Sequence, residues 1–507
     1  MLIDHPRIYL DSQGQHTDAL LIADGVVQAT GDAARQQAPD DGPVLRPDAP
    51  YLMPALGDAH SHMWGLGLRP GAIDLRGLDA DQALQRLAEA SDDDDREWII
   101  AVNLDEHLFK AHQSLGRKEL DRLFPHRPVQ IYRVDRHAIW ANSQALQRAG
   151  LDDDFQPGDD GEAPRDDDGR LTGYLVDAAM YPVLESLPPT TIQEDREAFF
   201  QSARQMRALG IGFTTIARSS VAHVAMLEGL RDEGQLPIHI DVLVAGDDPD
   251  FPKWSHRGPD AQAIDGLRIA GVKFYADGAL GSSGAHLLEP YLAGGKGLAM
   301  HPPGHLQEVI PRLMAQGWQV GVHAIGDAAA REVLDAFEAA TDEQRQRTRP
   351  RLEHAQMLTD EDCQRLVDMN IIASIQPIHF YDDLTWAPNR LSNEQLRRLY
   401  PWHRLKEAPT AFGSDYPIAD LNPWHGIATA MTRRIANGNL VHPDRAFDRH
   451  QALAAYLDGA AFASHREDHL GKLLPGYAAE VIALDTDPFR AEPEDIWEIE
   501  AAFVVPQ

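Results

Sequence analysis

The sequence predicts an α/β fold: a (β/α)8 barrel, with a small β-sheet domain made from both chain ends and an insertion after the first barrel strand. Three observations lead to this prediction. Eight short β-rich runs alternate with helical patterns along the middle of the chain, as repeated βα units do. Both chain ends carry further β-rich runs. The segment between the first two barrel strands is much longer than one crossover requires.

The chain ends are predicted to form one small domain. Residues 7–30 contain two β-rich runs around Asp24-Gly25, a dipeptide typical of a two-residue hairpin turn. Residues 478–488 and 499–506 have the same composition. Because chain ends often lie close together, we expect residues 1–51 and 466–507 to form a single β-sheet domain.

The barrel is predicted over residues 52–465. Helical patterns separate most of its strands, for example at 196–210, 305–317, 328–340 and 360–369. In such a barrel the reactive groups lie at the C-terminal ends of the strands. The expected strands are 52–59, 212–216, 238–244, 269–275, 319–325, 351–355, 371–377 and 408–414.

The insertion is expected over about residues 66–190, above the barrel mouth. It contains two acidic stretches, at 91–97 and 152–170, around more apolar segments. These stretches lack the glycine and terminal glutamate spacing of a calcium-binding EF-hand loop, which favours a solvated surface.

Composition restricts the partners. The chain has 507 residues, a formal net charge of −33 and 43% hydrophobic residues. A protein that grips phosphate groups needs a basic face, so nucleic acid and acidic membranes are not expected partners. The single cysteine, Cys363, excludes an internal disulfide framework and a thiolate zinc cluster. With no apolar run of about 18 residues and no leader pattern, we expect a soluble, cytoplasmic protein. Its oligomeric state stays open.

A histidine pair follows the first barrel strand. Alternation along an extended segment places His60 and His62 on one face, where both imidazoles could bind one metal ion. Taken alone, this pair among 23 histidines is more typical of an ordinary loop. Its significance depends on whether other ligands gather at the same place.

Lys273 is unusual because only seven lysines occur in the chain and this one lies in an apolar run, GVKFYADG. Alternation turns Lys273 into the barrel if Val272 and Phe274 face the helices. An unpaired buried ammonium is costly. The lysine therefore either pairs with a carboxylate, Asp277 or Asp415, or is carboxylated by CO2 to a carbamate that could bridge two cations.

Three more residues close predicted strands: His323, His354 and Asp415. Singly, each is typical of a core histidine or a helix-capping aspartate. Together with His60, His62 and Lys273 they come from strands one, four, five, six and eight, and would converge at one barrel end. This convergence predicts a metal site.

The order and surroundings of these residues resemble the amidohydrolase superfamily, in particular the branch that includes N-substituted formamide deformylases. The similarity covers nearly the whole chain, and its motifs include ALGDAHSH, VKFYADGALGS, GWQVGVHAIGDAA, EHAQML and FGSDYPIADLNPWHGI. The resemblance implies a distorted TIM barrel with a β-sandwich formed by both chain ends. Ser283 and Ala328 depart from the family pattern, where basic residues are expected.

The resemblance also implies roles. His60 and His62 would bind one metal ion, and His323 and His354 a second. Lys273 would bridge the two as N6-carboxylysine. Asp415 would be both ligand and catalytic base. Two Zn2+ ions suit this mixed imidazole and carboxylate set.

The implied reaction is hydrolysis of a carbon–nitrogen, amide-type, non-peptide bond by a metal-activated hydroxide. His137, His379 and Trp64 are candidate substrate contacts, although each could equally be a packing or surface residue. The alternatives are a deaminase or esterase of the same superfamily, or a non-catalytic metal-binding barrel. His323 lacks the HxxE element typical of deaminases, which favours the hydrolase.

Overall fold

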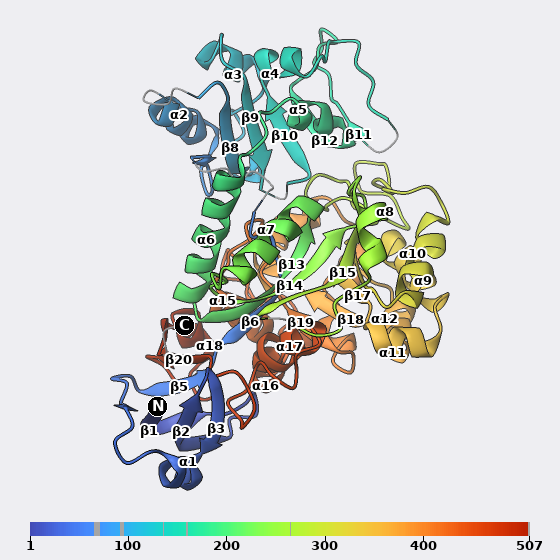
Figure 1. Cartoon of the computed structure of the whole chain (residues 1–507). Coiled ribbons are helices and arrows are strands. Elements are labelled where there is room, and N and C mark those ends of the chain that lie inside the picture. Colours follow the sequence, from blue (N-terminus) through green and yellow to red (C-terminus); the bar gives the residue numbers. More distant parts are fainter. Residues whose placement is uncertain (65–70, 92–95, 135, 159–160, 264, 505–507) are drawn as a thin grey trace.

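The computed structural model describes residues 1–64, 71–91, 96–134, 136–158, 161–263 and 265–504. Three β-sheets follow one another along the molecule (Figure 1): a sheet built from both chain ends at the bottom, the barrel in the middle and the sheet of the insertion at the top. We call the outer two the terminal sheet and the insertion sheet.

The barrel has the eight parallel strands that the sequence predicts, in the order β19-β18-β17-β16-β15-β14-β13-β6. Two hydrogen bonds of 2.7 Å join its edges: the Asp415 N–H donates to the His60 carbonyl, and the His62 N–H to the Tyr416 carbonyl. The barrel is therefore nearly closed. Its strands are β6 (Leu56–Ser61), β13 (Ile211–Ser219), β14 (His239–Ala245), β15 (Leu267–Tyr275), β16 (Gln319–Ala324), β17 (Arg351–His354), β18 (Ile372–Ile375) and β19 (Thr410–Phe412).

The first predicted strand, residues 52–59, is wrong as a single element. Its first half, β5 (Tyr51–Pro54), pairs with β20 of the terminal sheet, whereas β6 pairs with β13 of the barrel. The change of partner occurs within one step: the Ala55 N–H donates to the Glu480 carbonyl, and the Leu56 N–H to the Gly210 carbonyl. Both halves are apolar, so hydrophobic pattern alone could not reveal the boundary.

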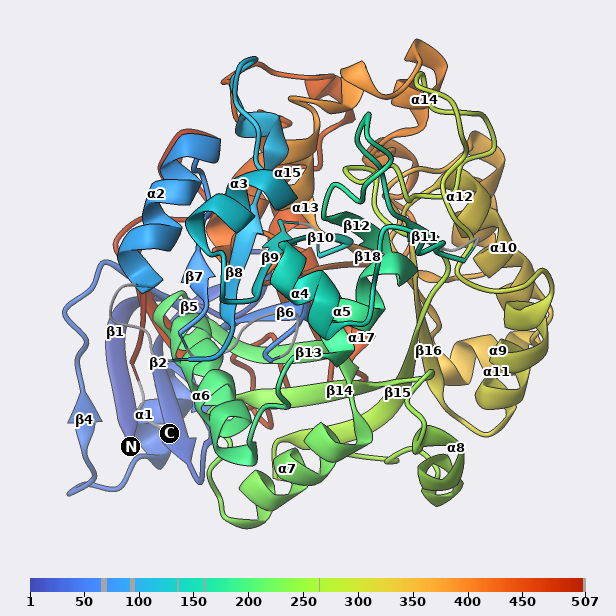
Figure 2. The same cartoon turned by 90° about the horizontal axis from the view of Figure 1, so that it is seen from above.

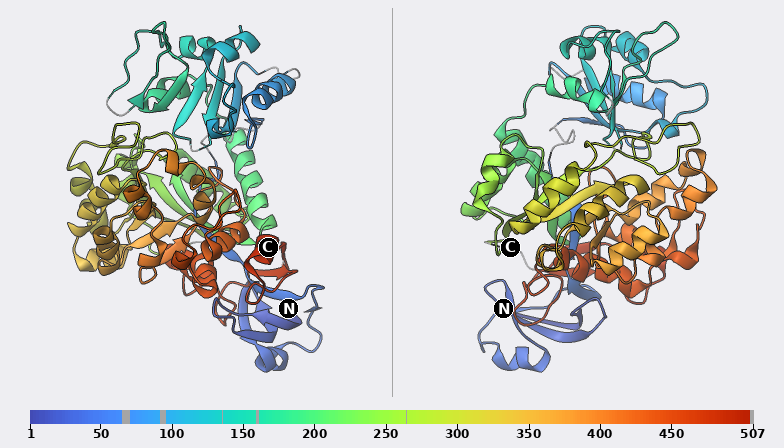
Figure 3. Two further views of the ribbon diagram at one scale, coloured as in Figure 1. Left: turned by 180° about the vertical axis from the view of Figure 1, so that it is seen from behind. Right: turned by 90° about the vertical axis from the view of Figure 1, so that its right-hand side faces the viewer.

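The terminal sheet has seven strands and contains both chain ends, as predicted. The ends lie near each other in both views of Figure 3. Asp24 and Gly25 adopt φ values of 51° and 71°, the left-handed conformation that a tight hairpin turn requires. The predicted arrangement of the terminal sheet as a two-layered β-sandwich stays a prediction, and so do the domain boundaries. The strands are β1 (Leu2–Tyr9), β2 (His16–Ala23), β3 (Val26–Thr30), β4 (Val44–Leu45), β5, β20 (Val481–Leu484) and β21 (Ala501–Phe503).

The insertion sheet lies between β6 and β13 in sequence and above the barrel mouth in space (Figure 2). It has its own apolar core, which includes Leu87, Ile99 and Ile131. Residues 92–95 and 159–160 of the two acidic stretches lie outside the described residues. The strands are β7 (Ile73–Asp74), β8 (Ile99–Leu104), β9 (Val129–Arg133), β10 (Ala138–Ala141), β11 (Gly161–Glu162) and β12 (Tyr174–Asp177).

The α-helices cover the barrel and the insertion. The longest, α6 (Ile192–Ala208), begins at a capping box in which Thr191 and Glu194 satisfy each other's backbone N–H groups. Over the described ranges, no helix is long and apolar enough to cross a membrane.

The helices of the terminal sheet and the insertion are α1 (Gly31–Gln37), α2 (Ala80–Ser91), α3 (Arg117–Leu123), α4 (Ser143–Arg148) and α5 (Tyr181–Glu185). The later ones are α7 (Val221–Asp232), α8 (Phe251–Trp254), α9 (His305–Ala315), α10 (Asp327–Glu338), α11 (Asp342–Thr348), α12 (Asp360–Asp368), α13 (Pro377–Asp383), α14 (Asn393–Arg398), α15 (Pro423–Thr432), α16 (Arg449–Ala454), α17 (Ala460–Ala463) and α18 (Pro493–Trp497).

Candidate metal centre and active-site cavity

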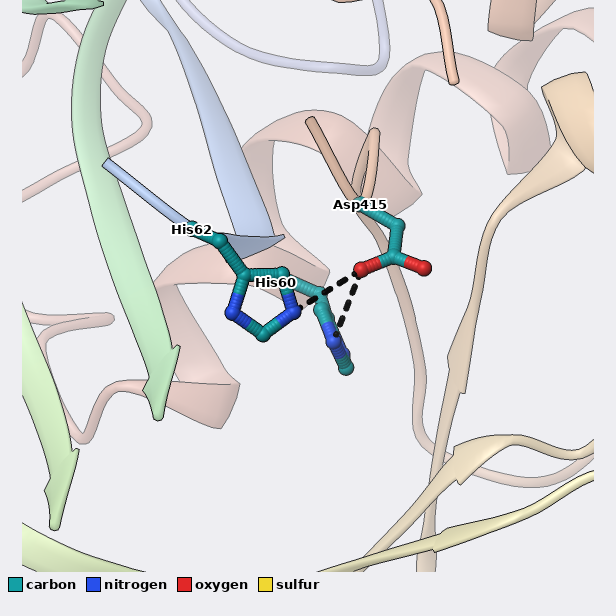
Figure 4. A group of neighbouring side chains, drawn as sticks. All are labelled: His60, His62 and Asp415. Carbon is teal, nitrogen blue, oxygen red and sulfur yellow. Dashed lines mark ion pairs between the residues drawn. The ribbon is translucent and has the colours of Figure 1, made fainter. Parts of the chain in front are cut away.

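His60, His62 and Asp415 meet at the C-terminal end of the barrel (Figure 4). The Asp415 Oδ1 atom lies 3.0 Å from His62 Nε2 and 3.3 Å from His60 Nε2. All three side chains are buried. The backbone at Gly413 approaches the backbone of His60 closely, since a Cβ atom on Gly413 would lie 2.5 Å from the backbone nitrogen of His60. Two imidazoles and a carboxylate at this spacing are a ligand set suited to zinc.

A second group shares Asp415. His354 and His379 place ring nitrogens within 4.8 Å of each other and of the Asp415 carboxylate. The distance from His379 Nε2 to Asp415 Oδ2 is 3.6 Å. His379 is therefore nearer to the candidate ligands than the role of substrate contact alone requires.

His323 lies beside this group. Its ring centroid is 4.5 Å from that of His354, but its Nε2 atom is 3.3 Å from the carbonyl oxygen of Gly278. The structure thus brings His323 to the predicted place, with one ring nitrogen directed at the loop that follows β15.

Lys273 points into the barrel among these residues, as alternation predicts. It is 1% exposed, and its Nζ atom has no hydrogen-bond partner among the described residues. Burial lowers its pKa to about 8, although the carboxylates of Glu353 and Asp415 partly offset this effect. A buried amine without a partner is the situation that carboxylation would resolve.

The suggested pairing of Lys273 with Asp277 is not found. Both Asp277 oxygens accept backbone hydrogen bonds, Oδ1 from Ile325 and Oδ2 from Gly326 and His286. Asp277 therefore fixes the turns that follow β15 and β16. Alternation correctly predicted the facing of the strand, but Asp277 lies beyond its end at Tyr275, where alternation no longer applies.

Glu353 is a functional candidate that the sequence reasoning missed. Its Oε2 atom accepts a hydrogen bond of 2.6 Å from His60 Nδ1, and Arg351 binds the same carboxylate at 2.7 and 3.1 Å. Because a carboxylate only accepts, the hydrogen lies on Nδ1 and the Nε2 lone pair of His60 faces Asp415. The signal was available: Arg351 and Glu353 are two charges within a short buried strand.

Electrostatics favour neutral imidazoles at His62, His323 and His354 and an ionised carboxylate at Asp415, which are the states that metal ligation requires. Burial lowers the pKa of His62 to about 4, with partial compensation from Asp415. Burial also holds the pKa values of His323 and His354 well below the ordinary value. For Asp415, burial alone would raise the pKa, but the imidazoles of His60 and His62 hold it well below its usual range.

Backbone strain marks two of these positions. His354 and Asp415 adopt φ values of 75° and 59°, in the left-handed region that side chains rarely enter. Such conformations persist only where the surrounding structure enforces them, and they gather at functional sites. Here they occur at the last residue of β17 and three residues after the end of β19.

The candidate ligands other than His60 line a cavity of about 1580 Å³ between the barrel and the insertion. This volume exceeds the roughly 300–1,000 Å³ of a usual small-molecule site. The barrel end, which we call the floor, contributes His62, Lys273, His323, His354, His379 and Asp415. The insertion side, which we call the roof, contributes Asp105, His107, Tyr132, Arg133, Arg136, His137 and Asp177, among others.

Two predicted substrate contacts lie differently. His137 lines the cavity, with its ring centroid 5.3 Å from that of His323. Trp64 is buried instead against Phe199 and His223, with ring centroids 5.5 and 4.7 Å away, and does not line the described cavity. Trp64 therefore packs the start of the insertion against the barrel helices α6 and α7.

One contact ties the roof to the barrel beside the cavity. The His107 ring stacks on Trp386 at 4.9 Å, and Arg390 Nη2 lies 3.1 Å from His107 Nε2. Arg390 also donates to Ser283 Oγ at 2.7 Å. Ser283 is one of the two positions where the family pattern has a basic residue, and here the guanidinium of Arg390, from a distant segment, lies beside it. We call His107, Trp386 and Arg390 the latch.

The chain is similar to known proteins along most of its length. The family model described as "Amidohydrolase family" matches residues 50–506. The chain is 29% identical over 503 residues to the putative amidohydrolase YtcJ of Bacillus subtilis, covering 96% of this chain and 94% of that protein. It is 25% identical over 523 residues to the N-substituted formamide deformylase of Arthrobacter pascens, covering 99% and 96%. A crystal structure of an uncharacterized metal-dependent hydrolase from Pyrococcus horikoshii superposes with a TM-score of 0.79 at 26% identity, covering 97% and 99%.

Proposed function

Because this chain belongs to the amidohydrolase family, we propose that it hydrolyses a carbon–nitrogen, amide-type, non-peptide bond of a small molecule. One observation carries the proposal: His60, His62 and Asp415 present three potential ligand atoms within 4.8 Å of one another, and His62 and Asp415 line a cavity large enough for substrate. The family membership and the formamide deformylase relative favour a carbon–nitrogen bond over other hydrolysable bonds.

The residues suit two divalent ions, with Zn2+ the best match to imidazole and carboxylate donors. His60, His62 and Asp415 would hold one ion, and His323 and His354 the other. Lys273, carboxylated on Nζ, would bridge them. Support for the bridge comes from the complete burial of a lysine amine that has no hydrogen-bond partner among the described residues.

The bound ions would polarise the substrate carbonyl and lower the pKa of water, which supplies the nucleophile at neutral pH. The chain itself moves the protons. Asp415, ionised beside two imidazoles, accepts the proton of the attacking water and passes it to the departing nitrogen, first as base and then as acid. His137 and His379, which line the same cavity, contact the substrate.

A substrate screen tests this function. The zinc-loaded protein is incubated with N-formyl, N-acyl, cyclic amide and ester compounds, and released amine and carboxylate are measured. We expect turnover of at least one amide-type class, loss of turnover after chelation, and recovery with added zinc. Hydrolysis of esters alone, release of ammonia from a ring amine, or no turnover at all would contradict the proposal and favour the esterase, the deaminase or the non-catalytic barrel.

A further inference from the structure

The roof carries a His–Asp pair that no role in the proposed metal centre explains. His137 Nδ1 lies 2.7 Å from Asp177 Oδ1, and the Asp177 side chain is fully buried. Both residues line the cavity, and they come from neighbouring strands, since His137 precedes β10 and Asp177 ends β12. A backbone hydrogen bond of 2.9 Å from the Asp177 N–H to the His137 carbonyl fixes their register.

Asp177 is held by a strained backbone and by two close glycine contacts. Its backbone adopts φ 47° and ψ −123°, a strained conformation for a residue other than glycine. Its Oδ2 atom rests against Gly278 and Gly284 of the loop after β15, where a Cβ atom would come within 2.8 and 2.4 Å of it. The carboxylate thus sits in a cradle that admits no side chain, and the insertion docks on the barrel at this point.

This arrangement determines which nitrogen of His137 carries hydrogen. The Asp177 carboxylate only accepts, so the hydrogen lies on Nδ1. In a neutral imidazole, the opposite nitrogen, Nε2, then has a lone pair and acts only as an acceptor. Nε2 lies on the ring edge away from Asp177, and the ring lines the cavity beside His323.

We propose that His137 Nε2 accepts a hydrogen bond from the N–H of the scissile amide and that Asp177 is the positioning residue that holds His137 in this state. The inference rests on the proposed function, because the contact is made to the substrate of that reaction. A secondary amide offers one acceptor, its carbonyl, and one donor, its N–H, and an acceptor-only nitrogen pairs with the donor. The inference therefore favours secondary amides, N-monosubstituted formamides among them, over tertiary amides, whose nitrogen carries no hydrogen.

Matched substrates test the preference. Each substrate that the protein cleaves is compared with its N-methyl analogue, which lacks the N–H. We expect the wild-type protein to favour the N–H compound in kcat/KM by about 100-fold, because the analogue cannot donate to His137 Nε2 once it fills the cavity. His137→Phe keeps a planar ring without an acceptor and should reduce the ratio towards one by slowing the N–H compound.

Two further variants separate positioning from simple docking. Asp177→Asn keeps the shape but allows an amide N–H to face His137 Nδ1, which releases the tautomer; Gly284→Ala displaces the carboxylate without altering any ionisable group. Both should reduce the N–H preference, and neither should reduce it further in the His137→Phe background. Asp195→Asn is the matched control, because His223 Nε2 lies 3.3 Å from Asp195 Oδ2 outside the described cavity.

Long-range 15N–1H spectra of histidine-labelled protein, assigned with the His137→Phe variant, report the tautomer directly. A hydrogen on Nδ1 of His137 supports the inference, and a hydrogen on Nε2 alone contradicts it. Equal rates for the two members of each wild-type pair would overturn the inference while leaving the proposed function intact. Loss of rate in Asp177→Asn that adds fully to that of His137→Phe would assign Asp177 a docking role only. Failure of the wild-type protein to cleave any amide would remove both proposals.

Discussion

The floor and the roof of the cavity are built in different ways. Except for His379, which lies on α13 and retains 13% side-chain exposure, the floor residues lie on barrel strands or within three residues of their ends, and they are buried. Backbone ladders between neighbouring strands set their spacing, and pairs such as His60 with Glu353 set ring orientation. The roof belongs to a separate sheet, and His107 and His137 retain 20% and 16% side-chain exposure.

The roof approaches the barrel through side-chain contacts, at the latch and at the cradle of Asp177. A single substitution can change such a side-chain contact without disturbing the backbone hydrogen bonds between neighbouring strands. The difference indicates a division of labour: the floor sets the class of reaction, and the roof sets which substrate reaches it. Changes in the floor should then remove catalysis or metal, whereas changes in the roof should alter affinity and selectivity.

The largest effect is expected from Asp415→Asn in the floor. The amide keeps the shape and one oxygen donor but cannot accept the proton of the attacking water, so kcat should fall by about 1,000-fold or more. Metal content, measured by atomic absorption, should be largely preserved. Asp195→Asn serves again as a control outside the cavity. Activity near that of wild type would remove Asp415 from the proton-transfer role.

Metal removal should also destabilise the protein. An ion that binds only the folded state at 100 times its Kd adds about 3 kcal/mol to the free energy of unfolding. We therefore expect the Tm of the chelated protein to be lower and to recover on addition of zinc. A Tm that does not respond to chelator or zinc, measured by differential scanning calorimetry, would argue against a metal centre in the floor.

Glu353→Gln should weaken metal binding without removing a ligand. Loss of the carboxylate leaves His60 without the partner that fixes its tautomer, and comparable changes cost about 10- to 100-fold in metal affinity. Competition with a fluorescent chelator measures the effect. Glu467→Gln is the matched control, since Glu467 forms an ion pair of 2.6 Å with Arg349 and neither residue lines the cavity. Equal metal affinities for the two variants would show that Glu353 does not act through His60.

The same division explains what the sequence could predict. Strand ends and side-chain alternation are local properties, so His60, His62 and Asp415 could be assigned to one barrel end before their distances were known. The boundary between β5 and β6 was missed because both segments are apolar and differ only in their partners. Glu353 was missed although Arg351, two residues earlier, places a second charge on the same strand, because the hydrogen bond from His60 to Glu353 joins residues 293 positions apart in sequence.

The roof was less predictable for a physical reason. The pairing of His137 with Asp177 joins residues 40 positions apart in sequence through the register of β10 and β12, and their glycine cradle lies on a barrel loop a further hundred residues along the chain. Arg390 likewise reaches Ser283 from a distant segment. These long-range contacts depend on how the insertion sheet packs against the barrel, and the local sequence pattern does not determine that packing.

The smallest effect is expected at the latch. Arg390→Ala removes the contacts to His107 and Ser283 and the ion pair with Glu106 at 4.0 Å but leaves the floor intact. A partly exposed ion pair contributes about 1 kcal/mol or less. KM should therefore rise by about threefold to fivefold with kcat nearly unchanged, because a looser roof holds the substrate less well. Arg404→Ala, which breaks an exposed pair with Asp360 away from the cavity, is the control. If Arg390→Ala instead lowered kcat as strongly as a floor variant, the separation between floor and roof would be wrong.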